Sequence, residues 1–203
     1  MNEYSGSIAS VEYLVNLTQE TKTAFFRGHS KACGKLVPRV FRPDVKIFEA
    51  CEKCYERWFF LEFRRIAPGL EKRLPRRSDG LSWLFLMQHY GAPTRLLDWT
   101  ENPLVALYFS VNEQLDQDGE LWILEAARLN FDGLRMPGFP LPNNPSVSFL
   151  VEKATDCLSD TKLLEKFGLK NPPILPIAIY PTLTFLRMIS QSSVFNNPQR
   201  DKT

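Results

Sequence analysis

The chain is poor in several features, and each shortage excludes a class of protein. No apolar run approaches the roughly 20 residues that cross a bilayer, so we expect no membrane partner. The formal net charge is only +2, which is too small to indicate nucleic-acid binding by itself. The opening MNEYSGSIAS is acidic and polar, unlike a secretory signal. We therefore expect a cytoplasmic protein.

Only four cysteines and two histidines are present, which limits the metal and redox sites that the chain can form. Cys51 and Cys54 form a CEKC pair inside an expected helix, whereas a redox pair of this kind normally opens a helix after a strand. A zinc site would need two more ligands, which His29 or Cys33 could supply. The plainer interpretation is two reduced cysteines one helical turn apart, so we expect no metal.

Several enzyme motifs are also absent. The chain has no G-x-x-x-x-G-K-[ST] phosphate-binding loop, no G-x-S-x-G elbow, no H-E-x-x-H zinc motif and no G-x-G-x-x-G turn after a strand. Enzymes built on these motifs are therefore not supported, and the function has to be sought in other residues.

What remains has the composition of an ordinary globular protein. Hydrophobic residues make up 44% of the 203 positions, which is enough for a sizeable core. The length fits a single domain over residues 1–203, with an N-terminal helix over 1–20 and a core over 23–195. Helical and strand patterns are mixed along the chain. We therefore expect an α+β fold with a mixed, largely antiparallel sheet core flanked by helices.

Local patterns predict where these elements lie. Helical spacing and capping residues predict helices over 10–20 with Ser10 as N-cap, 44–67 ending near Pro68, 80–91 with Gly91 near the C-cap, 103–115 opened by Asn102 and Pro103, and one or two over 146–169. Short apolar runs predict strands over 23–29, 94–100, 118–126 and 173–181, a helix or strand over 183–195, and a surface loop over 130–148.

The strongest functional signal is WLFLMQHYGAPTRLLDWTENPLVALYFS, residues 83 to 110. It places titratable and hydrogen-bonding side chains among apolar residues beside a helix start. A buried polar group that lacks a hydrogen bond costs roughly 1–3 kcal/mol. Such crowding is therefore typical of a ligand pocket. The polar residues concerned are His89, Tyr90, Arg95, Asp98 and Thr100.

Each of these residues also has a structural interpretation. A single histidine such as His89 is more often structural than catalytic, although a carboxylate partner would fix its tautomer. Thr100 could be an N-cap. Asp98 could be the partner of an arginine in an ion pair, and Trp99 could be a core residue or a platform for an aromatic ring.

Arg27 follows two phenylalanines in the expected strand FFRGH. An arginine there presents a rigid fork of donors to a phosphate or carboxylate, and Gly28 allows a ligand or another backbone to come close. The alternative is that Arg27 pairs with a nearby acid and holds the fold together.

A run of basic residues, RRIAPGLEKRLPRR, extends from Arg64 to Arg77 with Glu71 as its single acid. Such a run could contact nucleic-acid phosphates. The more common situation is a solvated surface of a helix and its following loop.

Five segments together resemble the FRG domain, a family named after an N-terminal Phe-Arg-Gly motif. They are FFRG (Phe25 to Gly28), KLVPRVFR (Lys35 to Arg42), LMQHYGAPTRLLDWTENPLVALYFS, DGELWILEAARLN and RMISQSSVF (Arg187 to Phe195). The resemblance covers nearly the whole chain, and the middle block is the most distinctive.

The order of these motifs is also similar to that of the ADP-ribosyltransferase superfamily. This second resemblance implies an ADP-ribosyltransferase-like fold with NAD as substrate. It implies that Arg27 holds the NAD ribose or phosphate, that Asp98 to Thr100 form the second motif, and that Gln191 lies at the ribose. Two residues after Gln191 the chain has Ser193, where the superfamily has a glutamate that stabilises the transition state. Activity would then depend on His89 or Asp98, or be absent.

We therefore expect the chain to bind NAD or a related nucleotide and to pass ADP-ribose to a macromolecule, possible roles being toxin action and phage defence. The expected catalytic residues are Arg27, His89, Asp98 and Gln191. The expected nucleotide-binding residues are Arg27, Gly28, Arg95, Trp99, Thr100 and Tyr108. The alternative is a catalytically inactive FRG module that recognises a protein or a nucleic acid.

Overall fold

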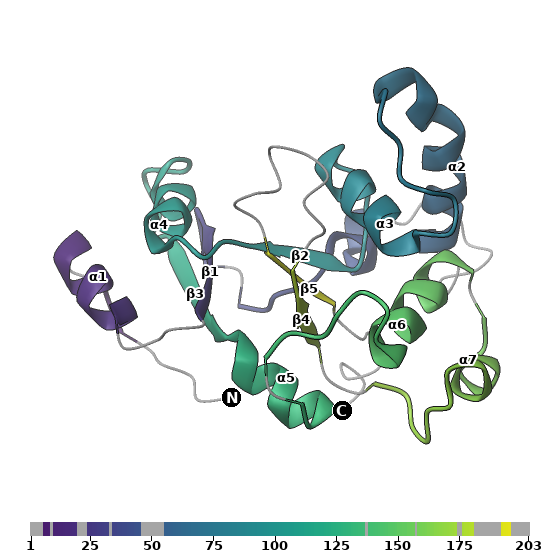
Figure 1. The fold of residues 1–203 in the computed structure, drawn as a ribbon. Coiled ribbons are helices and arrows are strands. Elements are labelled where there is room, and N and C mark those ends of the chain that lie inside the picture. The colour runs from purple at the N-terminus through teal and green to yellow at the C-terminus, as the bar shows by residue number, and fades with distance from the viewer. Residues whose placement is uncertain are drawn as a thin grey trace.

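The structure is a computed structural model, drawn in Figure 1. It describes residues 6–8, 10–19, 24–32, 34–45, 55–136, 138–156, 158–173, 176–180 and 192–195. Within these ranges the chain is a mixture of helices and small antiparallel sheets. The expected α+β class is thereby confirmed. None of the helices in these ranges is long and apolar enough to cross a membrane.

Helices and strands alternate irregularly along the chain. The α-helices of the described residues are α1 (Val11–Gln19), α2 (Tyr55–Leu70), α3 (Gly80–His89), α4 (Pro103–Val111), α5 (Ala126–Leu134), α6 (Pro145–Thr155) and α7 (Asp160–Phe167), with short 3-10 turns at Arg39–Phe41 (η1) and Pro43–Val45 (η2). The strands are β1 (Ala24–His29), β2 (Leu96–Trp99), β3 (Glu120–Glu125), β4 (Ile177–Ile179) and β5 (Ser192–Phe195).

Two antiparallel sheets meet at the centre. One consists of β1 and β3, and the other has the order β2-β5-β4. Phe26 in the middle of β1 forms an antiparallel bridge with Thr100, just after β2. Its two backbone hydrogen bonds, Phe26 N–H to Thr100 O at 2.7 Å and Thr100 N–H to Phe26 O at 2.9 Å, connect the two sheets. The end of β2 is therefore fixed against the middle of β1.

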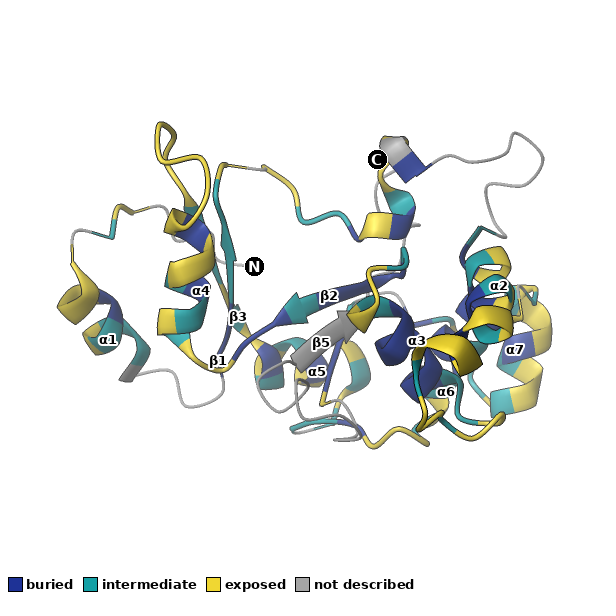
Figure 2. Cartoon of the chain, turned by 90° about the horizontal axis from the view of Figure 1, so that it is seen from above, coloured by how far each residue is buried: buried dark blue, intermediate teal, exposed yellow. Residues whose placement is uncertain are grey.

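The helices form two groups around these sheets (Figure 1). Helices α1 and α4 lie with β1 and β3 on one side, and α2, α3, α6 and α7 gather on the other, with β2 running between the groups. The largest core cluster belongs to the second group. Figure 2 shows α3 as its most buried element, because every residue from Leu81 to Met87 is buried. A helix that is apolar all round has to be enclosed by other elements.

Helix ends follow the expected capping chemistry. The backbone N–H of Tyr13 donates to the Ser10 hydroxyl at 3.1 Å, and that of Leu104 donates to Asn102 Oδ1 at 2.9 Å. Pro103 occupies the first turn of α4, where a missing N–H costs nothing. Gly91, after α3, has φ +75°, a left-handed conformation that suits glycine. These sequence predictions are confirmed.

Two predicted boundaries are wrong, and a third is close. Residues 43–45 form η2 rather than the start of a helix. Helix α2 ends at Leu70, near the predicted stop at Pro68 and Gly69. A proline in the last turn removes a single backbone hydrogen bond and need not end the helix at once. The helix predicted over 103–115 ends at Val111.

The expected loop over 130–148 is also shorter than predicted, because α5 extends to Leu134 and α6 begins at Pro145. Asn130, predicted to lie in this loop, is fully buried in α5. Its side-chain amide donates to Ala178 O and its carbonyl accepts from Ala178 N–H, both at 2.9 Å. No local sequence pattern predicts that a buried asparagine will hydrogen-bond to the backbone of a distant strand in this way.

Helix α4 packs directly against the first sheet, at Gly28 in β1 and at Gly119 just before β3. A Cβ atom built on Gly28 would lie 1.8 Å from the carbonyl oxygen of Ala106 and 2.8 Å from the backbone nitrogen of Ser110. On β3's side, a Cβ on Gly119 would lie 1.9 Å from Ser110 O. In the structure, the backbone that comes close to Gly28 is therefore that of α4.

Replacing Gly28 by alanine should destabilise the protein by about 3 kcal/mol or more, because a backbone carbonyl cannot move aside as a flexible side chain can. The matched control is Gly69→Ala in the last turn of α2, where nothing lies within 4 Å of the added Cβ. That change should be neutral or stabilise by up to about 1 kcal/mol. Urea unfolding of the two variants measures the difference, and equal stabilities would contradict the close α4–β1 packing.

Candidate functional site

Arg27 lies on β1 at the point where the two sheets meet. Side chains alternate along a strand, so Arg27 and His29 point away from the α4 side, on which Phe26 and Gly28 lie. The half-buried guanidinium donates from Nη1 to the backbone oxygen of Asp98 at 2.5 Å and from Nε to His29 Nε2 at 2.9 Å. Its position is thus fixed by both strands.

The neighbouring imidazole of His29 is held in its neutral form. Burial, and then the positive charge of Arg27, lower the pKa of His29 below its ordinary value of 6.5, with Glu120 opposing and Arg42 adding to the effect. A neutral ring is also what the geometry requires, because Nε2 accepts the hydrogen bond from Arg27. Arg27 and His29 therefore act as a single polar unit.

The carboxylate of Asp98 is oriented from α3 rather than by Arg27. Asp98 Oδ2 accepts a hydrogen bond from Gln88 Nε2 at 3.0 Å. The carbonyl oxygen of the same Gln88 side chain accepts from the hydroxyl of Thr94, which in turn accepts from the backbone N–H of Leu96 at 3.2 Å. This chain of contacts fixes which side of the Gln88 amide faces Asp98, and leaves Asp98 half-buried with an oriented carboxylate.

Arg95 has a structural role. Its backbone N–H donates to Glu56 Oε1 at 2.8 Å, and its Nε donates to Glu56 Oε2 at 2.6 Å. The side chains of the pair are only 6% and 5% exposed. Among the described residues, Arg95 Nη1 is buried and has no hydrogen-bond partner. This ion pair attaches α2 to the start of β2, so the described geometry gives Arg95 no contact with the Arg27 unit.

Trp99 and Thr100 also take part in holding the fold. Trp99 is 5% exposed and packs in a core cluster with Phe25. Thr100 bonds Phe26 through its backbone, and its hydroxyl accepts from Asn102 N–H at 3.1 Å before α4 begins. The indole N–H of Trp99 is buried and has no hydrogen-bond partner within the described part of the chain.

Two further candidates lie on the surface. His89 is exposed at the end of α3, where its ring contacts that of Tyr90 with centroids 5.3 Å apart. The Tyr90 hydroxyl donates to Leu70 O at 3.1 Å. Tyr108 on α4 is 56% exposed and lies edge-on to Phe109. The contacts of His89 and Tyr108 are therefore outside the Arg27–Asp98 cluster.

The last predicted catalytic residue, Gln191, lies outside the described residues. The strand that follows it, β5, runs antiparallel to β2, and its backbone pairs Ser193 with Asp98. Ser193, at the position where the superfamily has its glutamate, is thereby paired with the first residue of the second motif. All four cysteines also lie outside the described residues, and within those residues no group of three or more histidine, cysteine or acidic side chains could hold a metal ion.

The sequence patterns single out Arg27, Arg95 and Asp98 but not the side chains that bond to them. In the structure these partners are His29, Glu56 and Gln88, respectively. His29 could have been found, because it follows Arg27 by two residues in a strand and so shares its face. Glu56 and Gln88 carry no such signal. Their roles depend on how α2 and α3 dock against β2, which the local sequence does not specify.

Comparison with known families agrees with the FRG resemblance. Residues 22–119 match the family model described as the FRG domain, a segment that includes Arg27, His29, Gln88 and Asp98. No curated protein and no solved structure matches the chain. The match supports membership of the FRG family for this part of the chain.

Removing the acid of the buried ion pair should be strongly destabilising. Glu56→Ala leaves the Arg95 guanidinium buried without its counter-charge, so we expect a loss of about 3–5 kcal/mol. The control is Glu62→Ala, which breaks the exposed pair with Arg65 and should cost no more than about 1 kcal/mol. Chemical denaturation measures both. A loss at Glu56 as small as that at Glu62 would contradict the structural role of Arg95.

The lowered pKa of His29 makes stability depend on pH. The unfolded chain takes up a proton near the ordinary pKa of 6.5, whereas the folded chain does so only at lower pH. The free energy of unfolding should therefore fall as the pH drops from about 7 to about 5.5. The decrease should be smaller in His29→Gln than in wild type. An unaltered pH profile in His29→Gln would refute this account.

Proposed function

We propose that the chain, with its FRG segment at residues 22–119, is an ADP-ribosyltransferase-like domain that binds NAD or a related nucleotide at Arg27. In this proposal it passes ADP-ribose to a macromolecular acceptor. Such an activity would fit a toxin or a phage-defence protein.

The observation that supports this proposal most is the fixed Arg27 guanidinium. It is half-buried and is oriented by Asp98 O and by His29. An arginine fork that is already ordered loses little conformational freedom when it grips a phosphate or a ribose hydroxyl. The neutral His29 beside it adds no positive charge, so Arg27 would supply the anion-binding charge of this unit.

The proposed transfer requires one bond to break and one to form. The bond between ribose C1′ and the nicotinamide nitrogen breaks, and its electron pair leaves with nicotinamide. A nucleophile of the acceptor bonds to C1′ and gives up its proton. The Asp98 carboxylate, oriented by Gln88, would stabilise the positive charge on the ribose or accept that proton. By resemblance, Gln191 would contact the ribose.

A second candidate is a binding module without catalysis. It is favoured by the internal use of predicted ligand residues, since Arg95 is paired with Glu56 and Thr100 bonds Phe26 and Asn102. Ser193 in place of the usual glutamate also favours it. In that case the Arg27 unit would recognise a group on a protein or nucleic acid without any bond being broken.

Arg27→Ala should weaken NAD binding by about tenfold to a hundredfold, the effect of losing hydrogen bonds from a charged donor, and should abolish nicotinamide release. Arg128→Ala is the control, because Arg128 is on α5 with a side chain 69% exposed. Calorimetric titration with NAD and an assay of released nicotinamide measure the two effects.

Arg27 also contributes to folding through Asp98 O, so unfolding midpoints are measured alongside. Arg27→Lys keeps the charge but loses the fork, and is the deciding variant if Arg27→Ala does not fold. NAD binding by wild type without nicotinamide release would favour the binding module. Unchanged NAD affinity in a folded Arg27 variant would refute the proposed site.

A further inference from the structure

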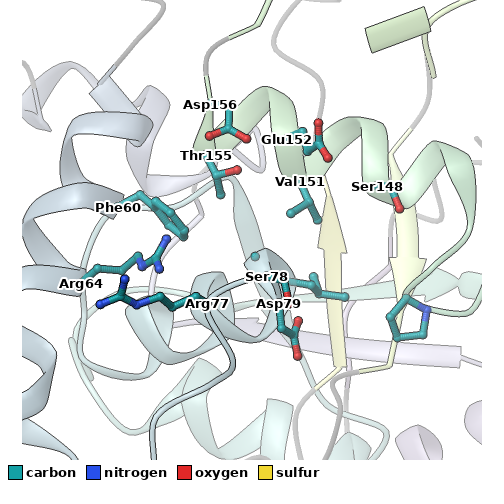
Figure 3. A pocket seen from close by; sticks show the side chains of 13 residues that line it. Phe60, Arg64, Arg77, Ser78, Asp79, Ser148, Val151, Glu152, Thr155 and Asp156 are labelled. Atoms are coloured by element: carbon teal, nitrogen blue, oxygen red, sulfur yellow. The ribbon is translucent and has the colours of Figure 1, made fainter. Parts of the chain in front are cut away.

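A second candidate site lies among the helices of the larger core cluster, on elements other than those that carry Arg27. A pocket of about 390 Å³ opens between α2, the start of α3 and α6 (Figure 3). This volume is within the usual range for small-molecule sites. The basic run from Arg64 to Arg77 contributes its first and last residues to the lining.

One side of the pocket is cationic. Arg64 projects from α2 with its guanidinium carbon 5.3 Å from the Phe60 ring centroid and 5.1 Å from that of Trp83, so two aromatic rings help to hold it in place. Arg77 approaches from the connection to α3, and Figure 3 shows the two guanidinium groups on the same side. Among the described residues neither forms an ion pair, whereas Arg65 is paired with Glu62 at 2.9 Å.

The acid at the start of α3, Asp79, caps the helix. The carboxylate of Asp79, which also lines the pocket, accepts from the backbone N–H of Ser82 at 3.0 Å and from its hydroxyl at 2.7 Å. Two neighbouring guanidinium groups that are not in an ion pair repel each other, and an anion bound between them removes that repulsion. Phosphate, with several acceptor oxygens, fits a pair of arginines particularly well.

The other side of the pocket is acidic and rich in hydroxyl groups. It is formed by α6 through Ser148, Glu152, Thr155 and Asp156. Glu152 accepts two contacts from Lys166 Nζ, at 2.8 and 2.7 Å, while Asp156 is exposed at the end of the helix. Carboxylate oxygens accept hydrogen bonds from sugar hydroxyls, as in many nucleotide sites.

We propose that this pocket binds a phosphorylated sugar, free or as part of a nucleotide. The phosphate would lie between Arg64 and Arg77, and the sugar hydroxyls would donate to Asp156 and Glu152. The cationic and acidic sides of one pocket then match the two ends of one ligand. This site is separate from the Arg27 proposal, and either can fail without the other.

The test is calorimetric titration with ribose 5-phosphate. Wild type should bind it, and Arg77→Ala should bind it at least about tenfold more weakly, because a charged hydrogen-bond donor to phosphate is lost. Arg73→Ala is the matched control, since Arg73 belongs to the same basic run and does not line the pocket. Its affinity should match that of wild type. Arg77 is exposed, so both variants should keep the wild-type unfolding midpoint.

Three further comparisons identify the ligand and the site. Asp156→Asn should weaken binding of ribose 5-phosphate but leave that of inorganic phosphate unchanged. Comparing the affinity for AMP with that for ribose 5-phosphate shows whether the preferred ligand is a nucleotide or a free sugar phosphate. Arg27→Ala, or Arg27→Lys if the alanine variant does not fold, should bind ribose 5-phosphate as wild type does. Loss of binding in that variant would assign the ligand to the Arg27 site and overturn the proposal.

Two other results would also overturn it. The first is no binding of ribose 5-phosphate by wild type at millimolar concentration. The second is a protein that binds a short oligonucleotide but not the sugar phosphate, with Arg73→Ala and Arg77→Ala weakening oligonucleotide binding equally. That result would identify the whole basic run as a nucleic-acid surface.

Discussion

The structure depends on the junction between β1 and the end of β2. Two backbone hydrogen bonds between Phe26 and Thr100 join the sheets there, and the Arg27 guanidinium adds a third contact to Asp98 O. Gly28, the next residue, has no Cβ, so the backbone of α4 can occupy the position that a side chain would take. One short segment, FFRG, thus connects a sheet, a helix and a second sheet. The same segment carries Arg27, at which we propose that the nucleotide binds.

Arg27 and Arg95 differ in what surrounds them. Arg95 is almost fully buried and has a dedicated acid, Glu56, that also bonds its backbone. Arg27 is half-buried, and its guanidinium donates to a backbone carbonyl oxygen and to a neutral imidazole. A buried arginine with its own counter-charge stabilises a fold at best. An ordered arginine near the surface can also bind an external anion.

The sequence predicts the elements well where the signal is local. Ser10, Asn102 and Gly91 mark helix ends because capping depends on neighbouring residues. It fails where tertiary contacts decide, as at Asn130, whose burial in α5 serves the backbone of Ala178 far along the chain. The site follows the same rule. Arg27, Arg95 and Asp98 lie in recognisable motifs, whereas Glu56 meets Arg95 and Gln88 meets Asp98 only after the helices dock.

The central claim is that Arg27 binds a nucleotide rather than serving only as an internal link. NMR of arginine Nε–H groups tests it directly, because the signal of each arginine reports its own hydrogen bonds. On titration with NAD, the Arg27 signal should shift in a saturable way, while that of Arg95, buried against Glu56, should stay in place. An Arg27 signal that does not move at millimolar NAD would contradict the account and leave Arg27 as a structural residue.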